Sequence, residues 1–216
     1  MDIAIALFDR FTALDAIGPY EVLSRLPGAR VTFLAERPGP VGTDNGMLTL
    51  HAEHALADLP APEILLVPGG PGTREMMEDQ TLIEWVRTAH ATSTWTCSVC
   101  TGSLVLGAAG LLEGLPATTH WAAMDLLAFT GAAPVSERVV RANEKIITAA
   151  GVSAGIDMAL TLAAEIAGET VAQTIQLGIE YDPQPPFHAG SPASAPPGVV
   201  GAVRAVIAAR TATVSR

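Results

Sequence analysis

Short apolar runs alternate with segments of helical periodicity along most of the sequence, and this alternation most constrains the fold. Four short runs, at residues 3–7, 31–35, 63–67 and 94–99, have the length of buried strands, and the first three are mainly apolar. The segments that connect them place apolar residues at helical spacing, between Gly and Pro punctuation. The pattern predicts an α/β fold with a mainly parallel sheet sandwiched by helices.

Further elements extend the same alternation to the end of the chain. Residues 42–54 predict a small hairpin excursion, because an Asp-Asn-Gly turn lies between short alternating segments. We expect one domain over residues 1–216, since this length suits a single α/β core. The additional predicted strands are 117–120 and 139–147, and the predicted helices are 18–26, 76–91, 102–112, 122–129, 154–167 and 198–212.

Composition excludes several classes of function. The net charge is −10 and no local cluster of Lys or Arg offsets it, so the chain is not expected to bind nucleic acid. Its apolar runs end before the roughly 18 residues that a membrane span requires. The N-terminus lacks the order of basic, apolar and small residues of a secretory signal, which predicts a cytoplasmic protein without membrane association.

Cys100 is the strongest candidate for chemistry. It stands where a predicted strand gives way to a helix, with small neighbours that permit a sharp turn. Free amides at a helix N-terminus favour a thiolate, so we expect this position to lower the pKa of the thiol. The alternative is that Cys100 is a small buried apolar residue, a common fate of cysteine.

Cys97 lies three residues before Cys100 and invites comparison with redox or metal-binding pairs. In an extended strand, however, the two Cα atoms would stand about 10 Å apart, which is too far for a disulfide. A zinc site would need more Cys or His ligands nearby. We therefore expect Cys97 to be a core residue and predict no metal site.

A thiolate that attacks an unsaturated carbon needs donors for the developing negative charge. The glycine turn after residues 63–67 should lie at the same sheet edge as Cys100. Pro71 has no amide hydrogen, so Gly70 and the Thr101 amide are the candidate donors. The alternative is an ordinary strand-to-helix turn, because the glycine spacing is not that of a phosphate-binding loop.

A proton donor or acceptor is also required, and Asp15 should stand at this edge, in the connection that precedes Gly18. Its alternative role is to cap the following helix. Glu21 is a rival carboxylate one helical turn onward. His120 is a possible second base, although a lone histidine beside a tryptophan is more often a hydrogen-bonded structural group.

Several motifs together resemble the ThiJ/PfpI superfamily, which has a flavodoxin-like, class I glutamine amidotransferase-like fold. The likeness spans nearly the whole chain, and within the superfamily it is similar to the isocyanide hydratases, where Thr101 rather than His follows Cys100. The matching segments are residues 14–19, 68–70, 98–112, 117–121, 155–157 and 180–192.

This resemblance implies an enzyme that adds water to an isocyanide and releases an N-substituted formamide. It implies that Cys100 attacks the terminal isocyanide carbon, that Asp15 handles the proton and activates water, and that Thr101 hydrogen-bonds near the sulfur. Val152 corresponds to a position that packs near the nucleophile, although ordinary core packing explains it equally well. A small-molecule substrate, no metal or organic cofactor, and a homodimer are also implied.

Other classes of function stay open. AraC-type regulators carry a similar domain, so a stand-alone ligand sensor is one alternative. Oxidation of Cys100 in a redox response is another. A glyoxalase or deglycase is a third, and the absence of His directly after Cys100 weakens this assignment.

Overall fold

A seven-stranded sheet forms the centre of the computed structural model, which describes residues 1–212. The strand order is β10-β11-β7-β6-β1-β2-β5, and every neighbouring pair is parallel except β10 with β11. The predicted α/β fold with a mainly parallel sheet is therefore confirmed. The strands are β1 (Asp2–Ala6), β2 (Arg30–Ala35), β5 (His54–Ala55), β6 (Ile64–Val67), β7 (Trp95–Val99), β10 (Val139–Arg141) and β11 (Ile146–Ala149).

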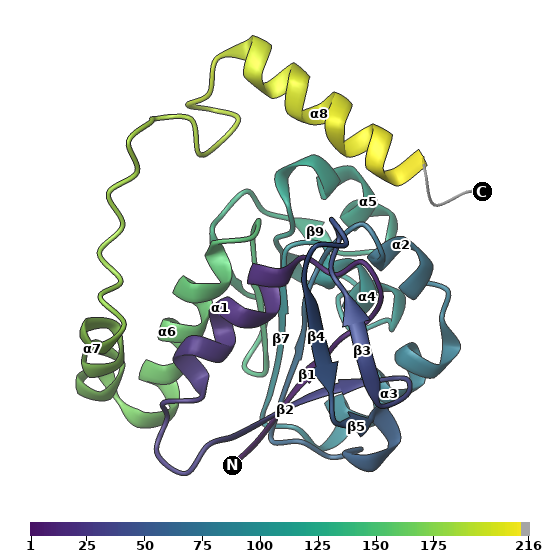
Figure 1. Cartoon of the computed structure of the whole chain (residues 1–216), viewed down its shortest axis with the longest axis vertical. Helices are drawn as coiled ribbons and strands as arrows, with labels where there is room; N and C mark the ends of the chain where they lie inside the picture. Colours follow the sequence, from purple (N-terminus) through teal and green to yellow (C-terminus); the bar gives the residue numbers. More distant parts are fainter. Residues whose placement is uncertain (213–216) are drawn as a thin grey trace. The chain divides into compact units, whose positions relative to one another are not determined.

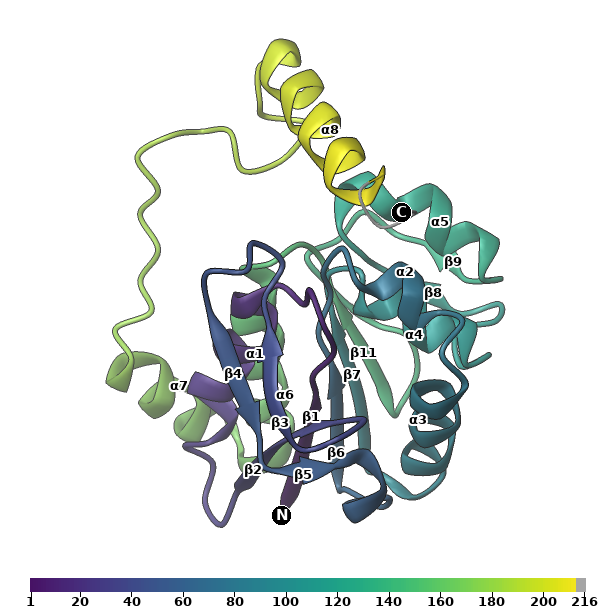
Figure 2. The same cartoon turned by 45° about the vertical axis from the view of Figure 1, so that its right-hand side comes forward.

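Helices cover both faces of this sheet (Figures 1 and 2). On one face α1 packs against α6, which also contacts α7, while α3 and α4 contact each other and the strands on the opposite face. Because both faces are covered, β6 and β7 are buried at every residue, as expected of central strands in a parallel sheet. The helices are α1 (Ala13–Leu23), α2 (Thr73–Met76), α3 (Gln80–Thr92), α4 (Gly102–Ala108), α5 (Met124–Phe129), α6 (Ala154–Ala167) and α7 (Glu169–Gly178).

The start of α1 differs from the prediction. The helix begins at Ala13, after an extended Thr12, so Asp15 lies in its first turn and not in the connection before it. Pro19, the second residue of the predicted helix 18–26, lies inside α1. A proline there cannot donate a hydrogen bond to the carbonyl of Asp15, yet burial of this helix face outweighs that loss.

Side-chain hydrogen bonds interrupt two predicted elements. The expected helix 76–91 is divided into α2 and α3, because the Asp79 side chain accepts the Leu82 amide at 2.8 Å and caps a new helix. The expected strand 139–147 is the antiparallel pair β10 and β11. Asn143 makes the turn between them, since its Oδ1 accepts the amides of Lys145 and Ile146, each at 2.8 Å.

Three other elements also depart from the sequence-based expectation. Only Pro116–Ala117 of the predicted strand 117–120 is extended, as β8, paired with β9 (Ala133–Pro134). Helix α4 ends at Ala108, before the predicted residue 112. Helix α7 was not predicted, because a single residue, Gly168, separates it from α6.

The predicted hairpin is confirmed. Strands β3 (Gly39–Gly42) and β4 (Thr49–Ala52) pair antiparallel, with Gly42 opposite Thr49. The Thr43 amide donates to the Leu48 carbonyl at 3.0 Å and closes the loop that contains the Asp-Asn-Gly sequence. Short 3-10 helices follow β5, at Leu56–Asp58, and precede α5, at Trp121–Ala123.

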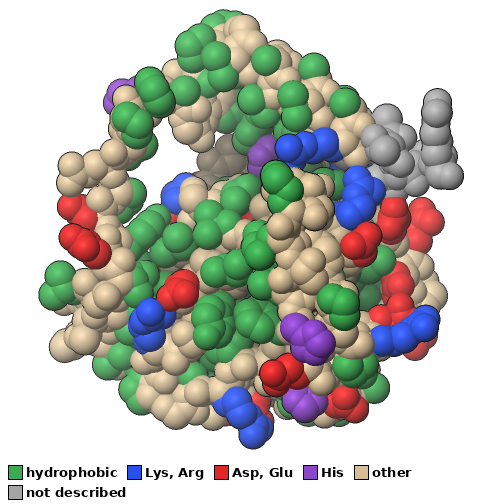
Figure 3. All heavy atoms as spheres, in the orientation of Figure 1, with side chains coloured by type: hydrophobic (Ala, Val, Ile, Leu, Met, Phe, Trp, Pro, Cys, Tyr) green, Lys and Arg blue, Asp and Glu red, His purple; other side chains and the backbone are tan. Residues whose placement is uncertain are grey.

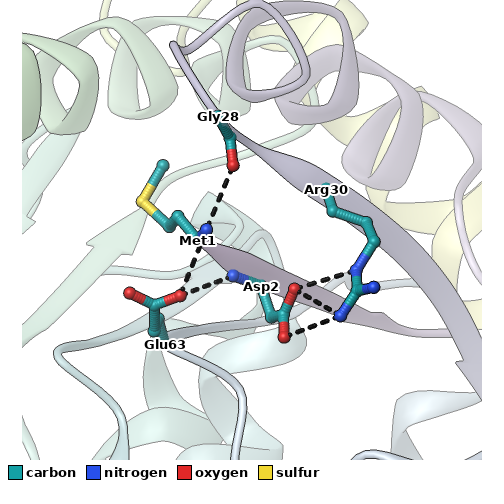
Figure 4. A network of polar contacts seen from close by, with 5 residues as sticks. All are labelled: Met1, Asp2, Gly28, Arg30 and Glu63. Carbon is teal, nitrogen blue, oxygen red and sulfur yellow. Dashed lines mark hydrogen bonds and ion pairs between the residues drawn. The ribbon is translucent and has the colours of Figure 1, made fainter.

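A polar network joins the amino ends of three neighbouring strands (Figure 4). The Met1 ammonium group donates to the Gly28 carbonyl at 3.0 Å, and the Asp2 amide donates to Glu63, just before β6, at 2.7 Å. Arg30, at the start of β2, makes two 2.9 Å hydrogen bonds to the Asp2 carboxylate. These exposed contacts add little stability, but they fix the strand register at the edge opposite the candidate site.

The chain separates into two compact units, Met1–Ile179 and Glu180–Arg216. The second contains a Pro-rich segment and α8 (Pro197–Ala212), and a single domain over residues 1–216 stays a prediction. Within the described residues, no helix is both long and apolar enough to cross a membrane. Apolar side chains are interspersed with charged ones over the face drawn in Figure 3.

Candidate active site

The carboxyl ends of three adjacent strands carry the candidate site. β1, β6 and β7 are neighbours in the sheet, and they lead to Asp15, Gly69 and Cys100 respectively. A crevice at the carboxyl edge of a parallel sheet is the usual place for ligands in open α/β folds. The structure therefore brings Asp15 and Cys100 together from segments that are 85 positions apart, as the strand order requires.

Cys100 adopts a left-handed backbone conformation, with φ of 55°. Such a conformation costs a non-glycine residue about 1–2 kcal/mol, so neighbouring contacts must hold it. The Cys100 amide donates to the carbonyls of Ala149 and Ala150, at 3.1 and 2.9 Å. This is the strained strand-to-helix turn predicted from the sequence, and it directs the side chain into the site.

The Asp15 carboxyl group is completely buried, with a relative exposure of 0%. Its Oδ2 accepts the Gly69 amide at 2.9 Å, and the carboxyl also hydrogen-bonds to the Cys100 side chain. Burial raises the pKa of Asp15 from 3.8 to about 8, although the Gly69 and Cys100 hydrogen bonds oppose the rise. Oδ1 is buried without a hydrogen-bond partner among the described residues, so it is available to a bound ligand or water.

Gly69 permits this close approach. A Cβ atom at this position would lie 2.5 Å from the Thr101 nitrogen and 2.8 Å from both Asp15 Oδ2 and Cys100 Cβ. The nearest of these atoms belongs to the backbone, and Asp15 Oδ2 is held by its hydrogen bond to the Gly69 amide, so neither can readily move aside. The sequence predicted Gly70 as the functional glycine of this turn, and no local pattern distinguishes it from Gly69.

Three donors surround the Cys100 sulfur. The backbone amides of Thr101 and Val152 and the Thr101 hydroxyl all hydrogen-bond to it. Burial nevertheless raises the pKa of the Cys100 thiol well above its ordinary value, and the Asp15 charge adds to the rise. The predicted lowering by the helix N-terminus is therefore wrong, because desolvation of a thiol only 5% exposed outweighs these hydrogen bonds.

Gly70 and Thr101 form a reciprocal pair. The Gly70 amide donates to Thr101 Oγ1 at 2.9 Å, and this hydroxyl can donate its single proton either to the Gly70 carbonyl, at 3.2 Å, or to the Cys100 sulfur. The Gly70 amide thus reaches the sulfur only through the Thr101 hydroxyl. Val152, which the resemblance placed near the nucleophile, has a positive φ of 24° and presents its amide to the sulfur.

The remaining candidates have other partners. Glu21 is exposed and pairs with Arg25 at 2.7 Å. His120 Nδ1 accepts the Ala122 amide at 3.2 Å, and burial lowers the pKa of its ring. Cys97 is fully buried and a free thiol, and burial raises its pKa to about 12. Within residues 1–212, no group of three or more His, Cys, Asp or Glu side chains is arranged to hold a metal ion.

Fold and site together define an α/β protein with a cysteine on a strained turn and a buried carboxyl group against its sulfur. Residues 1–165 match the DJ-1/PfpI family, and the chain belongs to that family. A ThiJ/PfpI family protein from Pseudomonas syringae superimposes with a TM-score of 0.92 at 39% identity, over 97% of this chain and 87% of that one.

Two characterised relatives differ in how much of their length the chain matches. An isonitrile hydratase from Pseudomonas putida is 46% identical over 204 residues, which cover 94% of this chain and 89% of that protein. The transcriptional regulator CdhR of Pseudomonas aeruginosa is 32% identical over 146 residues, or 65% of this chain and 42% of the regulator. The enzyme is thus matched over most of its length and the regulator over less than half.

Proposed function

We propose that the chain is an isocyanide hydratase, which converts an isocyanide and water into an N-substituted formamide. The observation that carries the proposal is the contact between the buried Asp15 carboxyl and Cys100, in a chain 46% identical to an isonitrile hydratase over most of its length. Isocyanide hydration needs a soft nucleophile and proton transfer at carbon and nitrogen. One thiol and one carboxyl group supply both.

In the first step the Cys100 sulfur attacks the terminal isocyanide carbon. The Asp15 carboxyl gives its proton to that carbon and receives the thiol proton, so S–C and C–H bonds form as the S–H bond breaks. The product is a thioimidate on Cys100. A pKa of about 8 suits this exchange, because a group that titrates close to neutral pH gives and takes a proton with similar ease.

In the second step water attacks the thioimidate carbon. Asp15 Oδ1, which lacks another partner among the described residues, accepts a proton from this water, and the imine nitrogen receives one. The C–S bond then breaks, the oxygen becomes the formamide carbonyl, and a proton returns to sulfur. The free thiol is restored, and one isocyanide and one water have become one formamide.

Donors around the sulfur stabilise the negative charge that passes through it. The amides of Thr101 and Val152 and the Thr101 hydroxyl fill this role, and Gly70 orients that hydroxyl. A single preorganised donor of this kind is worth roughly 3 kcal/mol in the transition state. The near closure around Cys100 also favours a slender substrate whose reactive atom is terminal, as the carbon of an isocyanide is.

The test is formamide formation from a simple alkyl or aryl isocyanide by the purified protein. We expect turnover by the wild type and none above background by Cys100→Ser, because a buried serine hydroxyl is a far weaker nucleophile than the thiol. Circular dichroism would establish that the variant is folded. Turnover retained by Cys100→Ser would overturn the mechanism, and no turnover of several isocyanides by the wild type would favour a sensor or a glyoxalase-like enzyme.

The homodimer implied by the resemblance and the cytoplasmic location expected from the N-terminus belong to the same proposal. Apolar, Ala-rich helices such as α6 are compatible with a subunit interface. Light scattering of the purified protein and fractionation of cells would test the two expectations.

A further inference from the structure

Two buried hydroxyl groups converge on the backbone carbonyl of Cys100. Thr119 Oγ1 donates to this oxygen at 3.0 Å, and Ser103 Oγ donates to it at 3.2 Å. Ser103 belongs to the first turn of α4 and Thr119 to the loop after β8, and their exposures are 0% and 1%. A carbonyl oxygen has two lone pairs and can accept two hydrogen bonds, and the two hydroxyls donate both of them.

The same peptide group carries a donor to the sulfur. In a trans peptide the C=O and the following N–H point to opposite sides of the C–N bond, and the six atoms lie in one plane. The N–H that follows the Cys100 carbonyl is that of Thr101, and it hydrogen-bonds to the Cys100 sulfur. An oxygen held on one side of the C–N bond therefore keeps the N–H on the other side directed at the sulfur.

This peptide needs such support because Cys100 is strained. Its φ of 55° is unfavourable for a non-glycine residue, and rotation of the peptide toward an ordinary conformation would turn the Thr101 N–H away from the sulfur. The Cys100 amide is already fixed by Ala149 and Ala150. The carbonyl side of the residue is fixed by Ser103 and Thr119.

We propose that Ser103 and Thr119 are positioning residues that hold the Thr101 amide against the Cys100 sulfur during the reaction. They act through the backbone and do not touch the reacting atoms. The kinetic part of this inference rests on the proposed isocyanide hydration, whereas its effect on the thiol does not. Without the two hydroxyls, the sulfur would lose part of the hydrogen bonding that favours its negative charge.

The variants for the test are Thr119→Val and Ser103→Ala, which remove one hydroxyl each, together with Thr119→Ser, which restores one. Thr96→Val is the matched control. It also removes a fully buried threonine hydroxyl, but from the opposite end of β7, where Thr96 hydrogen-bonds to His90 and Ser93. Circular dichroism and thermal unfolding would establish that each variant is folded, and Ser103→Ala carries the test if Thr119→Val does not fold.

Two measurements distinguish positioning from a general loss of stability. The first is the pH at which Cys100 becomes reactive toward iodoacetamide, which we expect to rise in Thr119→Val and in Ser103→Ala. The second is isocyanide turnover, where we expect kcat to fall about tenfold at nearly unchanged KM, less than the loss of a whole oxyanion donor. Thr119→Ser should return both values to within twofold of the wild type.

The proposal is overturned if folded Ser103→Ala and Thr119→Val keep the wild-type alkylation profile, or if Thr96→Val shifts it equally. If the wild type does not hydrate isocyanides, the proposed function fails, and the alkylation profiles alone decide whether Ser103 and Thr119 position the amide. The failures of the two proposals are therefore distinguishable.

Discussion

The buried Asp15 carboxyl should make stability depend on pH in an unusual direction. Its pKa is raised by burial from 3.8 to about 8, so the folded state keeps a proton that the unfolded chain loses in this interval. The folded state binds more protons there, and stability must fall as pH rises from 4 to 8. Each pH unit lowers the free energy of unfolding by about 1.4 kcal/mol, so Asp15 alone lowers it by about 5 kcal/mol between pH 4 and pH 8.

Asp15→Asn provides the comparison, because an amide keeps an oxygen for the Gly69 hydrogen bond but does not titrate. The free energy of unfolding of both proteins would be measured by urea denaturation at several pH values between 4 and 8. Other groups contribute to both curves and cancel in the difference. We expect the wild type to lose about 5 kcal/mol relative to Asp15→Asn over this interval.

Asp125→Asn, which removes an exposed carboxylate from α5, controls for the loss of one charge. Its curve should run parallel to that of the wild type. If the difference between the wild type and Asp15→Asn stays constant to within about 1 kcal/mol, the carboxyl does not hold a proton in the folded state, and the mechanism in which it acts as a proton donor is refuted.

Two further predictions concern neighbouring residues. Gly69→Ala should lower the melting temperature and abolish isocyanide turnover, because the new methyl group would lie 2.5 Å from the Thr101 nitrogen. The control Gly178→Ala should do neither, because its methyl group would meet no neighbouring atom within 4 Å. A normal melting temperature with full activity in Gly69→Ala would contradict the described packing. Cys97→Ala should retain isocyanide turnover, because Cys97 is fully buried and burial raises its pKa to about 12. Intact mass after iodoacetamide treatment should show one modified thiol in both the wild type and this variant. Loss of the reactive thiol in Cys97→Ala would mean that Cys97, not Cys100, is the nucleophile.

The core strands could be predicted because buried strands are rich in apolar residues, which are visible in the sequence. Strands β1 and β6 are mainly apolar runs bounded by turn residues, and parallel pairing follows from their alternation with helices. The errors lie where one side chain redirects the backbone. Asp79 starts a new helix and Asn143 makes a tight turn, and both depend on hydrogen bonds that apolar periodicity does not reveal.

Asp15 illustrates a different limit. The sequence predicts its position at the sheet edge but places it outside the helix, because proline is typical of the first turn of a helix and Pro19 lies four residues after Asp15. The consequence is chemical, since a carboxyl group in the first buried turn of α1 is desolvated and keeps its proton near neutral pH, whereas one in an open connection would be ionised. The sequence predicted where Asp15 lies, but its protonation state depends on burial that only the structure reveals.

The environment of Cys100 shows why the rest of the site was not predictable. The groups that hold its turn and face its sulfur are largely backbone amides and carbonyls, at Thr101, Ala149, Ala150 and Val152. Almost every residue has the same backbone amide and carbonyl, so the sequence does not show which of them contact the Cys100 sulfur. Residue types suggest the candidate nucleophile, Cys100, and its proposed proton partner, Asp15. Only the fold determines which amides favour the charge on sulfur and which hydroxyls keep those amides in place.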